Sequence, residues 1–370
     1  MCDALRAIDQ SVINYDLATK LVEHVCASME PGAILVFMPG LAEISKLHER
    51  LGANPTVRAA TGGGKYLIGL HSTLSTAEQR TIFEHPPGGV RKIVIATNIA
   101  ETSLTIDGIK YVIDPGFCKQ KSYNPRTGME SLMVTPTSQA SALQRAGRAG
   151  RTSAGKCFRL YTAWSFQNEL DPNTVPEIQR TNLASVILSM LALKLGSIED
   201  FPFVDPPDSR FVKDGFRLLF ELGAVNEKQQ LSTLGRKLAK LPIDPRLARM
   251  VLAGAERGCL RDVLIVVSAL AIQDPRDRPA DKRQAADQAH QRWHDPDSDF
   301  VALLNLWHGI ENARDALSGN QLRRWCREHY INYLRMREWH DTFRQLRQLL
   351  RDMDIEVPAP LPRDENESEE

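Results

Sequence analysis

The chain has 370 residues, more than one hydrophobic core usually supports, so we expect two or three domains. Its 46 basic residues balance its 46 acidic ones and 42% of residues are hydrophobic, which excludes a disordered or uniformly basic chain, so any nucleic-acid surface must be local. Apolar runs fall far short of the roughly 20 residues that span a bilayer, and the amino terminus lacks a signal-peptide core. We expect an intracellular, cytoplasmic protein without a membrane partner; a nuclear or organellar location stays open.

The first part of the chain predicts an α/β layer. Over residues 32–162, the apolar runs AILVFM, YLIGL, KIVIAT, YVIDPG and CFRLYT are separated largely by helical patterns. Runs that are apolar throughout are typical of strands buried on both faces, so the sheet should be mostly parallel. Between two of these runs, residues 117–136 form two extended arms around turn residues at 124–128, which predicts an inserted β-hairpin.

Helices dominate after Trp164. The stretch EIQRTNLASVILSMLALKL predicts one amphipathic helix, and a second is expected over about Asp208 to Leu222. The following AVNEKQQLSTLGRKLAKL suggests a short two-stranded wing and a further helix, which together favour a small winged-helix unit. From Arg246 to about Met353 the pattern predicts a helical bundle, and the residues after it are too acidic and polar to pack.

One long arginine-rich helix is expected to close the bundle. Its mixture of basic and aromatic residues suits a surface that tracks a nucleic-acid strand. Its apolar spacing is equally typical of bundle core, and Glu328, Glu338 and Asp341 can pair with some of the arginines, so both interpretations stay open. The residues concerned are Arg323, Arg324, Arg327, Arg335, Arg337, Arg344, Arg347 and Arg351, with Trp325, Tyr330, Tyr333 and Trp339.

The stretch QRAGRAGR (144–151) carries two interior glycines that cost a helix about 1 kcal/mol each relative to alanine. On an α-helix, Gln144, Arg148 and Arg151 fall on one stripe, with Arg145 at its edge. The other side carries only Ala146, Gly147, Ala149 and Gly150, so we expect it to lie very close to a neighbouring element. Guanidinium groups in a row match phosphate oxygens, and a glutamine beside them can orient an attacking water. A solvated arginine face is the plainer alternative.

Polar side chains also follow the run KIVIAT. Thr97, Asn98, Thr102 and Ser103 lie beyond the end of a predicted strand, where open α/β sheets bind ligands. Hydroxyl and carboxamide groups there can bond phosphate or ribose oxygens without adding charge. Helix capping or turn formation explains any one of them as well.

No metal site is predicted. The six cysteines, at positions 2, 26, 118, 157, 259 and 326, include no CxxC pair. HQRWH at 290–294 spaces two histidines like a zinc-binding HExxH but lacks its glutamate, so we expect it on the surface. ATGGGKY at 60–66 imitates a phosphate-binding loop, but Ala59 and Tyr66 occupy two required positions, and a glycine-rich turn is expected instead.

Taken together, five segments resemble motifs IV, IVa, V, Va and VI of the DEAH-box RNA helicases of superfamily 2. They are LVFMPG (35–40), LHSTLSTAEQ (70–79), IATNIAETSLTI (95–106), VIDPG (112–116) and QRAGRAGR. Further on, TNLASVILSM and PIDPRLARM resemble the winged-helix domain and the start of the ratchet domain of that family. The stretch from SALAIQDPRDRP to DPDSDF is most similar to the bacterial HrpA type, and the first half to eukaryotic relatives.

The resemblance implies roles for the matching positions. Arg148 and Arg151 would be arginine fingers on the γ-phosphate, and Gln144 would lie beside that phosphate and the attacking water, which makes these three the expected catalytic residues. Phe83 would stack on adenine, Asp107 would lie near the ribose and Ser103 would lie between the nucleotide and the nucleic acid. The nucleic-acid backbone would be held by Gly40, Ser72, Thr73, Thr97, Asn98 and Thr102, and the hairpin would wedge strands apart.

The resemblance also implies a RecA-like domain at 1–165, a winged-helix domain at 166–241, a ratchet domain at 242–355 and an acidic tail or linker at 356–370. ATP, or another NTP, with Mg²⁺ would be held mainly by a first RecA-like domain, because the sequence contains neither a phosphate-binding loop nor a DEAH motif. This chain alone is therefore expected to be inactive as an ATPase. The expected partners are RNA, as a single strand or as a duplex with a single-stranded extension, the first RecA-like domain and an activator protein.

The expected activity is NTP hydrolysis coupled to 3′ to 5′ translocation and to remodelling of RNA duplexes or RNA–protein particles. Two alternatives stay open. One is a non-enzymatic RNA-binding or scaffold protein that keeps the helicase shape. The other is a DNA helicase of the same superfamily, because backbone contacts distinguish the two sugars poorly.

Overall fold

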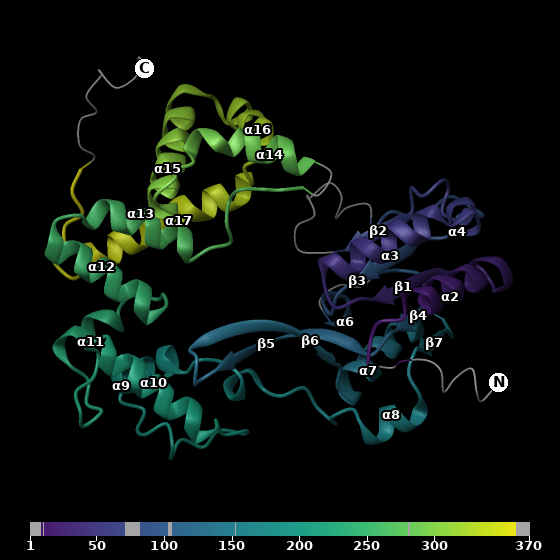
Figure 1. Cartoon of the computed structure of the whole chain (residues 1–370), viewed down its shortest axis with the longest axis horizontal. Helices are drawn as coiled ribbons and strands as arrows, with labels where there is room; N and C mark the ends of the chain where they lie inside the picture. Colours follow the sequence, from purple (N-terminus) through teal and green to yellow (C-terminus); the bar gives the residue numbers. More distant parts are fainter. Residues whose placement is uncertain are drawn as a thin grey trace. The chain divides into compact units, whose positions relative to one another are not determined.

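The computed structural model describes residues 9, 11–70, 82–102, 106–151, 153–279 and 282–359. The chain forms two compact units, residues 1–181 and 182–370, which follow one another along the colour sequence from purple to yellow in Figure 1. The finer division into three domains and a tail stays a prediction.

A parallel sheet forms the centre of the first unit. Its order is β2-β3-β1-β4-β7, and every neighbouring pair is parallel. Each strand overlaps one of the five apolar runs, so the predicted α/β layer is confirmed. The carboxyl ends of parallel strands share one edge of the sheet and the amino ends share the other. The strands are β1 (Ala33–Phe37), β2 (Leu67–Leu70), β3 (Ile93–Ala96), β4 (Ile109–Asp114) and β7 (Lys156–Arg159).

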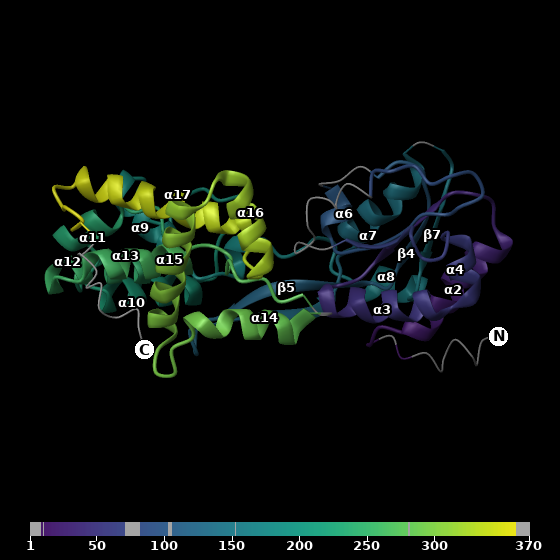
Figure 2. The ribbon, with the colours of Figure 1, turned by 90° about the horizontal axis from the view of Figure 1, so that it is seen from above.

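Both faces of this sheet are covered, which explains why its strands are apolar throughout. Ile34 and Val36 of β1 point into one core, and Leu35 and Phe37 point into the other. The first core is completed by α2 (Tyr15–Ser28), α3 (Leu41–Ala53) and α4 (Pro55–Ala60). The second includes residues of the short helix α6 (Ile99–Thr102). Figure 2 shows α2, α3 and α4 on one side of the sheet and α6 on the other.

The expected hairpin is present. β5 (Phe117–Asn124) and β6 (Met129–Pro136) pair antiparallel over their full lengths. The β5 strand is held near its far end by Arg180, whose guanidinium donates to the Lys121 carbonyl at 3.0 Å. The Arg180 carbonyl accepts from the Tyr123 N–H, also at 3.0 Å. Most of β6 is exposed, so this strand offers its side chains to solvent rather than to a core.

The second unit opens with the winged-helix elements α9 (Ala184–Leu193), α10 (Ser209–Glu221) and α11 (Thr233–Leu238). The single helix expected from residue 177 onward is wrong, because only a short 3₁₀ turn forms at 177–179 and α9 begins later. Asn182 explains the restart: its Oδ1 accepts the Ala184 N–H at 2.9 Å, a local bond that competes with helix formation before that point. The wing is reduced to one antiparallel bridge between residues 225 and 231.

The expected helical bundle follows. It is formed by α12 (Pro245–Arg257), α13 (Leu260–Leu270), α14 (Arg283–His290), α15 (Asp299–Ala316), α16 (Gly319–Glu328) and α17 (Tyr333–Arg351). In the described part of the chain, no helix is both long enough and apolar enough to cross a bilayer.

The single long helix expected at the end of the bundle is wrong, because the chain breaks between α16 and α17. Tyr330 adopts a left-handed backbone conformation (φ 54°) that an α-helix cannot contain. The break is fixed by the preceding loop: the Asp277 N–H donates to the Tyr330 carbonyl and the Asn332 N–H donates to the Pro275 carbonyl, both at 2.7 Å. Asn332 then caps α17.

Part of this region is bundle core. Trp339 is fully buried and its Nε1–H donates to the Ile265 carbonyl at 3.0 Å. Arg324 pairs with Glu328, and Arg344 pairs with Asp341. Two of the three acidic residues expected to pair with arginines therefore do so. RNA contact by the remaining exposed arginines stays a prediction.

His340 in α17 makes the stability of the second unit depend on pH. Burial against Trp307, with ring centroids 4.2 Å apart, and the charges of Arg314 and Arg344 lower the His340 pKa from 6.5 to about 4. The unfolded chain therefore takes up this proton first as the pH falls. The neutral His340 ring makes its full contribution to the free energy of unfolding above pH 6.5, and this contribution is lost progressively as the pH falls toward 4. Urea denaturation should show a loss of about 2 kcal/mol between pH 7 and pH 5.

His340→Gln removes the titrating group and should flatten that part of the pH dependence. The exposed His24 offers a matched control, and His24→Gln should leave the slope unchanged. A slope that survives in His340→Gln would contradict the assignment.

Candidate functional site

The segment QRAGRAGR changes helix type in its middle. α7 (Gln139–Ala146) begins at Ser138, whose Oγ accepts the Ser141 N–H at 3.1 Å, and a 3₁₀ helix, η1 (Gly147–Gly150), continues it. The continuous α-helix expected over 144–151 is therefore wrong. The Gly147 N–H still bonds the Leu143 carbonyl, four residues before it, and so makes the last α-helical bond of α7. Glycine has a low helix propensity, and the 3₁₀ helix begins at this residue.

The predicted close approach at Gly147 and Gly150 is also wrong for the described residues. A Cβ at either position would meet none of their atoms within 4 Å. The tight glycine is Gly155, where a Cβ would lie 2.1 Å from the Ala149 carbonyl oxygen and 2.5 Å from that of Lys110. The close contact thus holds the chain after η1 against β4 and Ala149, so the expected close packing is present at Ala149 and not at the two glycines.

Two arginines of the predicted catalytic set come together. Arg148 is 7% exposed, and together with Arg151 it borders a small hollow lined by Leu35, Ala100, Ile106 and Ile109. Burial lowers the pKa of Arg148, and the charge of Arg151 lowers it further, against the opposing effect of Glu101. A second positive charge beside a partly desolvated guanidinium favours the approach of an anion. Gln144 is exposed on α7 and does not line the hollow.

Arg145, at the edge of the predicted stripe, is the buried one. It is 1% exposed, and its Nε–H donates to Oε1 of Glu101 at 2.8 Å. Its Nη1 donates to Oδ1 of Asp114 at 2.7 Å and to the Phe117 carbonyl at 3.1 Å. Burial opposes its charge, but the carboxylates of Asp114 and Glu101 outweigh that effect and raise the Arg145 pKa. The arginine spacing does not predict this network, although acids within the apolar segments IAETSLTI and YVIDPG are a signal for a buried partner.

Residues matched to RNA binding lie at the carboxyl edge of the sheet. Gly40 follows β1 and caps α3, whereas Thr97 and Asn98 follow the neighbouring strand β3. Asn98 and Thr102 are exposed, at the two ends of the turn that contains α6. Lys119 of the hairpin reaches the same place, since a Cβ at Gly40 would lie 2.4 Å from its Nζ. Ser72, Thr73 and Ser103 lie outside the described residues.

Residues matched to the nucleotide base and ribose belong to the opposite edge. Asp107 lies in the turn before β4, and Lys92 immediately precedes β3. Burial lowers the pKa of Lys92, while the Asp107 charge acts in the other direction. The Lys92 Nζ also donates to the Ile82 carbonyl at 2.7 Å, and the next residue, Phe83, is 53% exposed. Lys92, which the sequence analysis missed, therefore links the two predicted nucleotide contacts.

The two sequence stretches that imitate a phosphate-binding loop and a zinc motif lie outside these groups. ATGGGKY forms a turn in which Gly62, Gly63 and Gly64 all have positive φ. His294 is exposed, but His290 is half-buried and its Nε2 lies 3.1 Å from the Tyr330 carbonyl, so a surface position is confirmed for one of the two. Among the described residues, no cluster of His, Cys, Asp or Glu could hold a metal ion.

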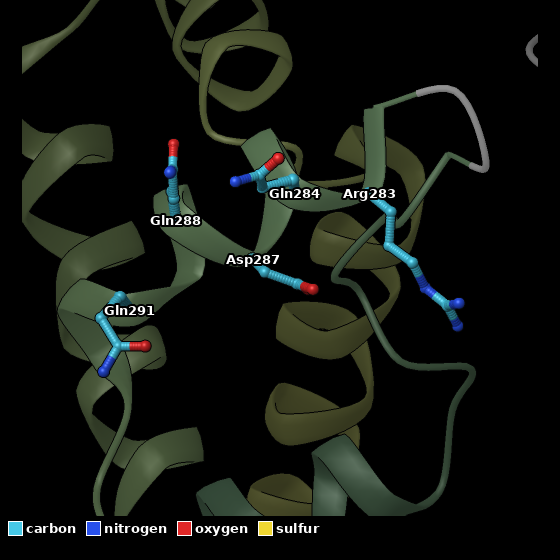
Figure 3. A pocket seen from close by; sticks show the side chains of 5 residues that line it. All are labelled: Arg283, Gln284, Asp287, Gln288 and Gln291. Atoms are coloured by element: carbon cyan, nitrogen blue, oxygen red, sulfur yellow. The ribbon is translucent and has the colours of Figure 1, made fainter.

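The second unit carries a polar hollow of about 650 Å³ on α14. Figure 3 shows the side chains that line it: Arg283, Gln284, Asp287, Gln288 and Gln291. Asp287 is engaged by Arg278, at 2.8 Å from its Nη2. None of the residues predicted to bind nucleotide or RNA lines this hollow.

Three protein families match successive parts of the chain. The helicase conserved C-terminal domain matches residues 14–153. Two helicase associated domains follow, a winged-helix one at 216–243 and a ratchet-like one at 244–303.

Curated relatives match nearly the whole chain. The ATP-dependent RNA helicase HrpA of Escherichia coli is 50% identical over 331 residues, which are 88% of this chain and 25% of that protein. An HrpA homolog of Haemophilus influenzae is 48% identical, with 88% and 25% covered. The pre-mRNA-splicing factor ATP-dependent RNA helicase prp22 of Schizosaccharomyces pombe is 41% identical, with 90% and 28% covered. The chain spans about a quarter of the length of these relatives.

Substitution by alanine distinguishes the crowded Gly155 from the open Gly147. Gly155→Ala should lower the free energy of unfolding of the first unit by about 1–3 kcal/mol, because a backbone carbonyl must move to admit the methyl group. Gly147→Ala should instead raise it by about 0.5–1 kcal/mol, because the site is open and its backbone is already helical. Urea denaturation of both variants tests this, and equal losses in the two would contradict the assignment.

Proposed function

We propose that this chain, which belongs to the DEAH-box family of RNA helicases, supplies one wall of an ATP site and part of an RNA path in an ATP-dependent RNA helicase. The observation that carries the proposal is the convergence of Arg148 and Arg151 on one hollow beside α6. ATP and Mg²⁺ are held mainly by a first RecA-like domain, which carries the phosphate-binding loop and the acidic residues.

Arg148 and Arg151 act on the γ-phosphate. The sheet face holds Arg148 mostly buried, so its guanidinium is partly desolvated before nucleotide arrives and needs less reorganisation. Negative charge that builds up on the transferred phosphoryl group relieves the repulsion between the two arginines. Gln144, on the preceding helical turn, orients the attacking water.

Phe83 and Asp107 recognise the rest of the nucleotide. The exposed Phe83 ring is available to stack on adenine, and Asp107 accepts a hydrogen bond from the ribose. Lys92 supports both, through the Ile82 carbonyl and through its charge.

RNA runs along the opposite edge of the sheet. The Gly40 turn, Thr97, Asn98 and Thr102 offer neutral donors to its backbone. By the resemblance to the family, Ser72 and Thr73 would add to these donors and Ser103 would couple RNA to nucleotide. Hydrolysis changes the closure of the two RecA-like domains and moves the strand 3′ to 5′ past the hairpin. The exposed side chains of β6 suit a wedge, because they are free to meet separated bases.

Experiment can distinguish two other functions from the proposed one. A non-enzymatic scaffold would bind RNA without hydrolysing ATP in any longer form of the protein. A DNA helicase would unwind DNA duplexes at least as fast as RNA duplexes. Unwinding assays on matched RNA and DNA substrates, together with ATP turnover, separate the three.

The 370-residue chain by itself should show negligible ATP hydrolysis, with or without RNA. The physical reason is that its arginines stabilise a phosphate that another domain must hold. Phosphate release from the purified chain measures this, and robust RNA-stimulated turnover would contradict the proposed split of the site.

In the longer enzyme, Arg148→Ala should lower kcat by about a thousandfold, because a finger acts mainly on the transition state. RNA affinity, measured by fluorescence anisotropy, should change little. Arg58→Ala, which removes an exposed arginine from α4, is the matched control and should leave both quantities near their starting values. A parallel loss of RNA affinity in Arg148→Ala would make it a backbone contact instead.

A further inference from the structure

Arg145 contacts residues of four elements, β1, β4, β5 and α6, at the carboxyl edge of the sheet. Glu101 belongs to α6, which follows β3, and Asp114 is the last residue of β4. The Phe117 carbonyl that it also bonds opens the hairpin strand β5. Its guanidinium lies over Phe37, the last residue of β1, with 5.0 Å to the ring centroid. One buried side chain thus joins the ends of three neighbouring strands to the base of the hairpin.

The acceptors of Arg145 fix the hairpin base in turn. Oδ1 of Asp114 also accepts the Gly116 N–H at 2.9 Å, and its Oδ2 accepts the Tyr161 hydroxyl at 3.1 Å. Gly116 has φ 85° and has no room for a side chain, since a Cβ would lie 2.7 Å from the Tyr161 ring. The Gly116 carbonyl accepts the Thr137 N–H from the other end of the hairpin at 2.8 Å. The direction in which the hairpin leaves the sheet therefore depends on Asp114 and its partner Arg145.

The phosphate-facing arginines are attached to the same short segment. Arg145 lies in the last turn of α7 and Arg148 lies in η1, which follows α7 directly. Arg145 is anchored at the carboxyl end of β4, whereas Arg148 and Arg151 lie beside Ile109 at its amino end. Glu101 acts on both, since it bonds Arg145 and its charge raises the pKa of Arg148. A displacement of η1 by a nucleotide must therefore be passed to α6 and to the hairpin base, or break these bonds.

We propose that Arg145 is a positioning residue that couples the γ-phosphate end of this segment to the RNA-handling hairpin and to α6. The inference rests on the proposed function. The planar fork is needed because Nε and Nη1 reach two carboxylates on two elements, and a lysine ammonium on a flexible stem does not hold both in this geometry. Losing the fork releases the hairpin base from the arginines without removing any group that touches phosphate.

The test uses the longer, ATP-hydrolysing protein that contains this chain, with Arg145→Lys as the variant. ATP hydrolysis without RNA should stay close to the starting value. The base pairs unwound per ATP consumed, and the stimulation of hydrolysis by RNA, should each fall about fivefold or more, the usual lower range of coupling between two sites. Glu101→Gln, which keeps the shape and one acceptor but removes the charge, should give a smaller loss of the same kind and decides the matter if Arg145→Lys fails to fold.

Arg91→Lys is the matched control for mere loss of stability. Arg91 also joins separate segments, donating to the Gly32, Met29 and Glu30 carbonyls at 2.8–2.9 Å, but these bonds go to the segment before β1 and not to the hairpin or η1. It should lower the melting temperature while leaving unwinding per ATP unchanged. Equal falls of hydrolysis and unwinding in Arg145→Lys, or no change in their ratio in both test variants, would overturn the proposal. Absence of RNA-stimulated hydrolysis in the unsubstituted protein would instead overturn the proposed function.

Discussion

The ion pairs of Arg145 with Asp114 and Glu101 are the constraint on which the arrangement of the first unit depends. Removing a guanidinium from water costs several kcal/mol, and the attraction of two carboxylates offsets that cost only when the geometry is tight. Here three elements supply the acceptors, so each must be in place for the charge to be tolerated. The fold thereby ties α6, the end of β4 and the hairpin base to one residue, and through it to the segment that bears Arg148.

That segment runs between two different chemical surfaces. At the carboxyl edge, Gly40, Thr97 and Asn98 offer neutral donors, which suit a backbone that is read for its position rather than its charge. At the amino edge, Lys92 joins Phe83 to Asp107, and Arg148 and Arg151 place positive charge nearby. Parallel strands make this separation possible, because they give a sheet two unlike edges.

The second unit shows how a distant segment decides local structure. The arginine-rich stretch would form one helix on propensity alone, but Tyr330 and Asn332 bond to residues 277 and 275 and turn the chain between α16 and α17. The turn lets Trp339 enter the core against Trp307, with ring centroids 5.1 Å apart.

The sequence by itself determined the α/β layer, its five strands, the hairpin and the helical bundle, because apolar runs buried on both faces and turn residues carry local signals. It also supplied the arginines that face the hollow. Only the tertiary structure decided which arginine pairs with buried acids, since the partners of Arg145 are Asp114 and Glu101, 31 and 44 residues away along the chain. The same holds for the change to a 3₁₀ helix, for the crowding at Gly155 and for the break before α17. In these cases either the contacting residue is distant along the chain, or the local preferences for two conformations are nearly equal. Tertiary packing then determines which conformation forms.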